Sequence, residues 1–422
     1  MSRKFFYGYV ILALCFVNMA VMRGVNGAFS VYYVALLEHF SWSHSDGASI
    51  ASANFLIYAL TAPLVGLAFD RFGPRLLMPL GAALVGLGLL LSGFADTLWN
   101  LYFSYGVVTA LGQGALGFVG HSALISYWFV RRRATAIGIA SMGQGFGALI
   151  MVTLTEWLIG RMGWRATYIS TAILILLTLV PANAFFQRRY PRDVGQYPDG
   201  DPTQRSADYF VRSASTMDWT LRDALLSFPF WCITLGHLAL GTAVFMITTH
   251  VVAHYVSLGF DKLTAAFIAG VIGFTRIGGT AMWGSVSDRL GRDPTYIIAT
   301  LVALAGVGCL IAMPVGSPLW FGYLSAICFS IGQSAGTPTY GAVIADIFSG
   351  RKVGSIFGYL EVGFGLGSAF GAWIGGYLFD LTGSYAWPFA LCFICFIISA
   401  AAIHVCLNWH ARQAAATHPA SP

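Results

Sequence analysis

Long apolar runs dominate this chain and constrain its fold more than any other feature. Each of twelve runs could form a membrane-spanning helix, which needs about 20 mainly apolar residues. They lie near residues 7–36, 46–69, 76–95, 98–127, 134–160, 165–186, 228–256, 263–287, 295–314, 318–346, 354–379 and 385–409. Only 9% of the 422 residues are charged, whereas soluble domains carry about a quarter. The sequence predicts an all-α membrane protein with twelve transmembrane helices and excludes a large extramembrane catalytic domain.

A polar segment divides the chain into two halves. Residues 189–222 hold five Arg, five Asp and three Pro in 34 positions, which is typical of a solvated linker. We therefore predict a six-helix bundle over residues 1–188, a cytoplasmic linker over 189–222 and a second six-helix bundle over 223–422.

The basic residues are unevenly distributed between the connecting segments. Of the 23 Lys and Arg, 18 lie on the side of the predicted linker, three lie on the other side, and Arg23 and Arg276 fall inside apolar runs. An excess of Lys and Arg marks the cytoplasmic side of a multi-pass protein. The pattern predicts a protein of the inner (plasma) membrane with both termini in the cytoplasm. The net charge of +6 is then a topology signal, and nucleic acid is not expected as a partner.

The two halves repeat each other at a nearly constant offset. Gly66, Asp70, Arg71 and Gly73 recur 218 positions later, and Gly112, Gln113, Arg131, Gly138, Gly143, Gly145 and Gly147 recur 220 positions later. Six-helix repeats of this kind build carriers that work by alternating access. No nucleophile, metal-ligand set or acid–base group converges in the predicted loops, so neither an enzyme nor a cofactor is expected.

Two motifs resemble those of a known family. The stretch from Gly66 to Arg75, with its echo from Gly284 to Arg292, resembles the loop signature of the major facilitator superfamily. Residues 127–147 resemble the helix 4 to helix 5 signature of its monocarboxylate porter family, which includes the bacterial oxalate:formate branch. The resemblance extends over all twelve runs and implies the major facilitator fold. The acidic-Gly-aromatic opening of animal members is absent, and residues 6–9 read Phe-Tyr-Gly-Tyr.

Arg276 is the ionisable residue whose position the predicted membrane topology explains least. It lies near the middle of the 263–287 run, where a charge costs about 2.5 kcal/mol or more on insertion scales. Its guanidinium stays charged and presents a planar fork that matches a carboxylate. The resemblance places the substrate-binding Arg of related carriers at Thr280, one helical turn away on the same face. We predict that Arg276 binds a substrate carboxylate; an interhelical salt bridge is the alternative.

Two residues are candidates for proton coupling. Glu361 lies about two turns inside the 354–379 run and could carry a proton or form a structural hydrogen bond. His250 lies one turn from His254 in the 228–256 run, and imidazole titrates in the physiological range. His250 could also bind substrate. This His pair has no acidic residue beside it, so no metal site is expected.

Uncharged residues at mid-membrane depth complete the predicted site. Asn26, Tyr58, Gln333 and Tyr340 offer hydrogen-bonding groups, and Phe118 offers an apolar wall. Such a wall suits a substrate with one carboxylate and a short carbon chain. Arg23 lies at a similar depth, and the sequence leaves open whether it faces a cavity, another helix or the headgroups.

Further motifs concern conformational change. The superfamily resemblance implies that Asp70, Arg71, Asp288 and Arg289 form gating charge networks at the cytoplasmic helix ends. The glycines at 143, 145 and 147, and those at 363, 365, 367 and 371, predict close-packing helix surfaces between the two halves.

These features predict a proton-coupled carrier of small monocarboxylates such as lactate or pyruvate, working as a monomer in the bilayer. An anion exchanger of the oxalate:formate type is the first alternative. That subclass has a second cation in the eleventh span, where this chain has Phe364. A transporter-like sensor that signals through the linker is the second alternative, and counterflow of labelled substrate separates a sensor from a carrier.

Overall fold

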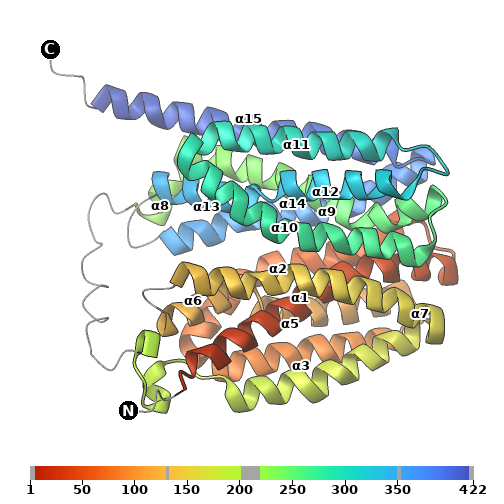
Figure 1. Ribbon diagram of the computed structural model, residues 1–422, viewed down its shortest axis with the longest axis horizontal. Helices are drawn as coiled ribbons and strands as arrows, with labels where there is room; N and C mark the ends of the chain where they lie inside the picture. Colours follow the sequence, from red (N-terminus) through yellow and green to blue (C-terminus); the bar gives the residue numbers. More distant parts are fainter. Residues whose placement is uncertain (1–4, 130–132, 201–218, 349–352, 418–422) are drawn as a thin grey trace.

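A computed structural model describes residues 5–129, 133–200, 219–348 and 353–417, and all regular secondary structure in these ranges is helical. Two bundles lie side by side (Figure 1). The first contains α1 (Gly8–Phe40), α2 (His44–Phe72), α3 (Pro74–Gly93), α4 (Leu98–Leu101), the π-helix η1 (Tyr102–Thr109), α5 (Ala110–Ala115), α6 (Phe118–Trp128) and α7 (Arg133–Phe186). The second contains α9 (Phe228–Ser257), α10 (Lys262–Leu290), α11 (Arg292–Ala312), α12 (Leu319–Gln333), α13 (Gly336–Ile347), α14 (Val353–Thr382) and α15 (Ala386–Thr417).

One end of the molecule holds both the start of α1 and the end of α15 (Figure 1), and we call it the terminal end. The short helices η2 (Pro191–Val194), η3 (Pro198–Gly200) and α8 (Leu221–Leu225) lie there too. The backbone N–H of Tyr7 donates to Gln196 Oε1 at 2.9 Å, and Gln196 Nε2 donates to the Phe5 carbonyl at 2.8 Å. These bonds fasten the start of the chain to the segment that follows α7. The other end is called the opposite end below.

Eight of the described helices are long and apolar enough to cross a membrane. One of them, α7, holds two of the predicted spans because Gly163 interrupts it with φ 79°. A glycine is needed at this corner, since residues with a Cβ rarely adopt positive φ. With α2 and the two interrupted runs described next, the spans number twelve, as the sequence predicted.

Two of the predicted runs are not continuous helices. The 98–127 run breaks at Leu116 and Gly117, between α5 and α6, and the 318–346 run breaks after Gln333, between α12 and α13. A glycine near each break packs tightly on the preceding span. A Cβ on Gly112 would lie 2.5 Å from the Gly81 carbonyl oxygen, and one on Gly332 would lie 2.5 Å from Ala303 Cα. The two halves therefore share this packing and this break, which an apolar run alone does not reveal.

The repeat is also visible in the turns at the terminal end. Gly73 ends α2 with φ 74° and ψ 172°, and Gly291 ends α10 with φ 89° and ψ 164°. Both belong to the loop motif, and only glycine adopts this conformation without strain. The motif thus sets the same tight turn in both bundles.

Small residues form the contact between the bundles, where α7 packs on α10 and α14 packs on α2. A Cβ on Gly145 of α7 would lie 2.7 Å from the Gly273 carbonyl oxygen, and one on Gly365 of α14 would overlap Ala59 of α2. The neighbouring glycines face helices of their own bundle. Gly143 and Gly147 pack on α1, while Gly363, Gly367 and Gly371 pack on α9. The predicted glycine surfaces are therefore close-packing faces, used both within and between the bundles.

Polar contacts join the bundles at the opposite end. Glu38 of α1 accepts a bond from Lys262 of α10 at 2.6 Å. Asp380 of α14 accepts the backbone N–H groups of His44 and Ser45 at 2.8 and 2.7 Å, and so caps the first turn of α2. At the terminal end, the hydrogen bonds of Trp128 with Arg188 at 3.2 Å and of His404 with Asp293 at 2.7 Å each lie within one bundle. In this conformation the bundles are fastened at the opposite end.

Candidate functional site

Two adjoining cavities lie between the bundles near the middle of the spans. The first, the Asn54 cavity, has a volume of about 20 Å³ and lies between α1, α2, η1 and α9. The second, the Arg276 cavity, has a volume of about 40 Å³ and lies between α1, α7, α9, α10 and α12. Arg23, Gly27, Ser30 and Thr248 line both. The cavities are thus two parts of one site at the interface of the repeats, where carriers of this architecture bind substrate.

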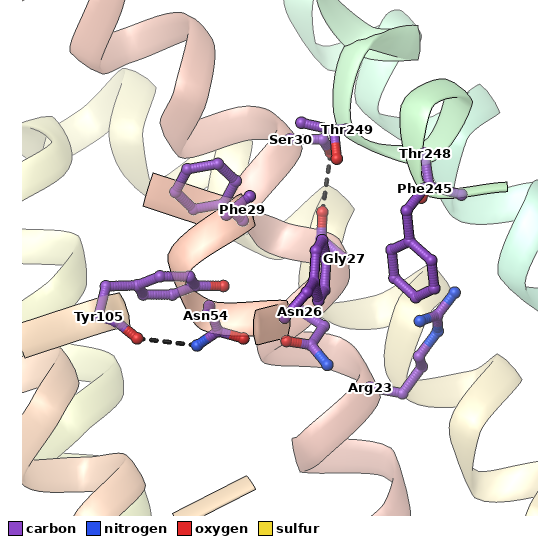
Figure 2. A pocket seen from close by; sticks show the side chains of 12 residues that line it. Arg23, Asn26, Gly27, Phe29, Ser30, Asn54, Tyr105, Phe245, Thr248 and Thr249 are labelled. Atoms are coloured by element: carbon purple, nitrogen blue, oxygen red, sulfur yellow. Dashed lines mark hydrogen bonds between the residues drawn. The ribbon is translucent and has the colours of Figure 1, made fainter. Parts of the chain in front are cut away.

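Arg23 of α1 faces both cavities, which settles the orientation that the sequence left open. Its guanidinium carbon lies 5.4 Å from the centroid of the Phe245 ring of α9, a cation–π distance (Figure 2). Within the described part of the chain no carboxylate forms an ion pair with Arg23. Its charge is therefore available to an anion in the cavity.

Arg276 of α10 lines the second cavity, as expected for a ligand of a carboxylate. Its Nη2–H donates to Thr337 Oγ1 at 3.2 Å, a neutral partner on α13. Arg276 comes from α10 and Arg23 from α1, and Arg23 also lines this cavity. Thr280 stands where related carriers have their substrate-binding Arg. Its hydroxyl donates to the Arg276 carbonyl at 2.9 Å. The site therefore holds two cations, one from each bundle.

Glu361 and Tyr58 lie on helices that pack on each other at the contact between the bundles. Glu361 is on α14 and Tyr58 on α2, and both are half-buried. Neither lines the Asn54 cavity or the Arg276 cavity, so their roles in the site stay predictions.

The remaining predicted residues divide into those that reach the cavities and those that do not. Asn26 lines the Asn54 cavity, and Gln333 lines the Arg276 cavity. The side chain of Phe118 falls outside the described part of the structure. The structure thus places Arg276, Asn26 and Gln333 around one site.

Tyr340 and His250, like Tyr58 and Glu361, line neither cavity. Tyr340 is 1% exposed and its hydroxyl is hydrogen-bonded to Ser399 of α15 at 2.8 Å. His250 is fully buried, its Nε2–H donates to the Ala372 carbonyl of α14 at 2.8 Å, and its ring lies 5.2 Å from that of Tyr33 of α1. Mid-span depth does not fix the direction in which a side chain points, so a role of either residue in binding stays a prediction.

The predicted gating residues lie at the terminal ends of α2 and α10. The guanidinium of Arg71 lies over the Phe72 ring at 5.3 Å, and Arg289 is exposed. The side chains of Asp70 and Asp288 fall outside the described part of the structure, so the gating network stays a prediction.

The sequence reading missed several residues of the Asn54 cavity. Asn54 of α2 is 1% exposed, and Tyr105 of η1 and Phe245 of α9 form aromatic walls (Figure 2). The sequence contains a signal for Asn54, because its amide lies in the middle of the apolar 46–69 run and a buried amide needs hydrogen-bond partners. The described residues contain no group of three or more His, Cys, Asp or Glu that could hold a metal ion.

The sequence profile of the Major Facilitator Superfamily matches residues 12–328 and 258–420. The chain belongs to this superfamily. It is accordingly a multi-pass membrane transporter and not an enzyme, as the sequence predicted.

Curated relatives and solved structures agree with this assignment. Monocarboxylate transporter 13 of Rattus norvegicus is 27% identical over 91% of this chain and 85% of its own length. Monocarboxylate transporter 12 of Rattus norvegicus is 28% identical over 93% of this chain and 84% of its own length. A bacterial homologue of the human lysosomal transporter Spinster, inward-facing and unoccupied, has a TM-score of 0.73 at 16% identity, covering 96% of this chain and 97% of its own. A D-xylose-proton symporter has a TM-score of 0.71 at 17% identity, covering 95% of this chain and 97% of its own. The likeness to the solved structures concerns the fold, while the curated relatives carry the name that residues 127–147 suggested.

Proposed function

We propose that this transporter carries small monocarboxylates together with protons by alternating access. The observation that carries the proposal is Arg276, a cation in a cavity at the interface of the two bundles. A carboxylate does not cross hydrocarbon by itself, and a guanidinium in a low-dielectric site is a strong counter-charge for it. The monocarboxylate transporters among the relatives support this substrate class.

Glu361 is the proposed proton carrier. It is half-buried on α14, one helical turn before Gly365, which packs on Ala59 of α2 at the contact between the bundles. Of the other two glutamates in the sequence, Glu38 is bonded to Lys262 at the opposite end, and Glu156, like Glu361, lines neither cavity. Movement of one proton with one carboxylate would make the cycle electroneutral.

The proposed orientation places the terminal end in the cytoplasm. The distribution of Lys and Arg supports it. With this orientation the contacts of Glu38 and Asp380 close the external side, and the described conformation is inward-facing. A plasma-membrane location, a monomeric state and a gating role of Asp70, Arg71, Asp288 and Arg289 belong to the same proposal.

Uptake into proteoliposomes tests the proposal. An inward proton gradient should stimulate uptake of labelled lactate or pyruvate, and Arg276→Gln should reduce it by about a hundredfold because a charged hydrogen-bond pair is lost. Arg276→Lys should be intermediate, since Lys keeps the charge but loses the bidentate fork. Arg161→Gln is the control, because Arg161 is exposed and packs on Trp157 away from the cavities. Full uptake by Arg276→Gln would refute the proposed role of this residue.

An organic anion exchanger of the oxalate:formate type is the second candidate. Arg23 favours it, because a second cation faces the cavity even though Phe364 occupies the position in the eleventh span. An exchanger should take up a labelled carboxylate only against internal carboxylate and should ignore the proton gradient. A proton-coupled carrier should show the reverse dependence in the same vesicles.

A further inference from the structure

The Asn54 cavity contains two buried hydrogen-bond acceptors that the described part of the chain leaves without a donor. They are Oδ1 of Asn26 and Oδ1 of Asn54. A buried acceptor without a partner is destabilising, and native proteins contain few of them. Both side chains line the same cavity, from α1 and α2, and in Figure 2 each oxygen is turned toward the other residue.

The orientation of the Asn54 amide is fixed by its surroundings. Its Nδ2 donates to the Tyr105 carbonyl at 2.8 Å, and Asn54 is 1% exposed. Because that carbonyl accepts and cannot donate, the nitrogen must face Tyr105 and the oxygen must face the cavity (Figure 2).

The hydroxyls of Tyr105 and Ser30 donate elsewhere. Tyr105 Oη donates to the Val25 carbonyl at 3.3 Å, and Ser30 Oγ donates to the Gly27 carbonyl at 2.8 Å. The two amide oxygens are thus free to receive a donor from a bound molecule, between the aromatic walls of Phe29 and Phe245.

The charge of the cavity selects the kind of donor. Arg23 lines both the cavity that holds the amide oxygens and the cavity that holds Arg276. A cationic donor such as an ammonium group would be repelled by this guanidinium, whereas a hydroxyl would not. A ligand that spans both cavities would place its carboxylate among the arginines and a neutral donor at the amides.

We propose that Asn26 and Asn54 form a specificity subsite for a hydroxyl group at the end of the substrate remote from its carboxylate. The inference rests on the proposed carboxylate transport and refines its substrate class. The preferred substrate is a hydroxylated carboxylate, in preference to an alkyl carboxylate of equal size.

Counterflow in proteoliposomes with matched acids tests the subsite. The acids are ω-hydroxy acids of three to five carbons, each compared with the alkyl acid in which a methyl replaces the hydroxyl, and with the ω-amino acid. The wild-type protein should have a KM about tenfold lower for at least one ω-hydroxy acid than for its alkyl partner, because one buried hydrogen bond is gained. Asn54→Leu and Asn26→Leu should remove this preference, so that the ratio of the KM of the alkyl acid to that of the ω-hydroxy acid falls to about one.

A matched variant separates specificity from folding. Asn18 lies on α1 like Asn26, but its buried amide is paired with that of Asn183, with 2.8 Å bonds in both directions. Asn18→Leu should therefore change the transport of hydroxylated and alkyl acids in equal proportion.

The possible outcomes distinguish the subsite from the function on which it rests. If Arg276→Gln abolishes transport of all the acids but the hydroxyl gives no advantage, the subsite is refuted and carboxylate transport stands. A preference for the ω-amino acid would overturn the selection of a neutral donor. If the wild-type protein exchanges none of the labelled acids, the proposed function itself is refuted.

Discussion

At the scale of single residues, the site depends on where a few polar groups point. Arg23 and Arg276 come from different bundles and line adjoining cavities, whereas His250 and Tyr340 line neither and are hydrogen-bonded to α14 and α15. The sequence shows how deep a residue lies along its helix. A shift of one residue in the position along the helix, however, turns the side chain by about 100° around the helix axis. The direction of each group therefore decides its role.

Glu361 carries a prediction at this scale. Glu361→Gln should abolish stimulation of uptake by a proton gradient and preserve counterflow of labelled lactate, because the amide cannot release a proton but still hydrogen-bonds. Glu361→Asp keeps a titratable carboxyl and should retain part of the gradient-driven uptake. Proton-driven uptake by Glu361→Gln at the wild-type rate would show that another group carries the proton.

At the scale of elements, glycines decide how closely the helices of opposite bundles approach. On α14, Gly365 lies against Ala59 of α2, while Gly358 has nothing within 4 Å of its Cβ position. The sequence placed Gly365 in a close-packing face and Gly358 only in the internal repeat, since a pattern of small residues marks a packing surface without identifying its partner. The packed structure separates a contact position from an open one on the same helix.

This difference gives a matched pair of variants. Gly365→Ala inserts a methyl group into the interface, and overpacking costs about 1–3 kcal/mol, so the counterflow rate should fall about tenfold or more. Gly358→Ala gains the same helix propensity without a clash in the described conformation and should stay within about twofold of the wild type. Rates should be normalised to folded protein from size-exclusion profiles; equal rates for the two variants would contradict a tight α14–α2 contact.

At the scale of the whole molecule, the described polar contacts between the two bundles lie at the opposite end. Asp380 spans the interface by accepting two N–H groups from the first turn of α2, where the helix leaves donors unpaired and carries a partial positive charge. An alternating-access cycle has to break this cap each time the opposite end opens.

Removal of the cap should therefore shift the conformational equilibrium. Asp380→Asn keeps one acceptor but loses the charge, and the closed opposite end should be destabilised by about 1 kcal/mol, a several-fold change in population. Spin labels at Asp46 of α2 and Leu263 of α10, both exposed at that end, should report a larger fraction of long distances in a cysteine-free background. Asp96→Asn is the control, because Asp96 pairs with Arg165 within the first bundle at 2.7 Å; an identical response to both changes would exclude a specific role of the cap.

The sequence by itself determined the twelve spans, the internal repeat, the superfamily and the cation that anchors the site. Apolar length, motif spacing and the cost of a charge in hydrocarbon are properties of the chain that need no knowledge of packing. Tertiary structure decided that Arg23 joins Arg276, that Asn54 and Asn26 present acceptors to a cavity, and that the fourth and tenth spans are broken. These features arise where helices from distant parts of the chain meet, and an apolar helix shows no polar face in its own sequence that would reveal such a neighbour.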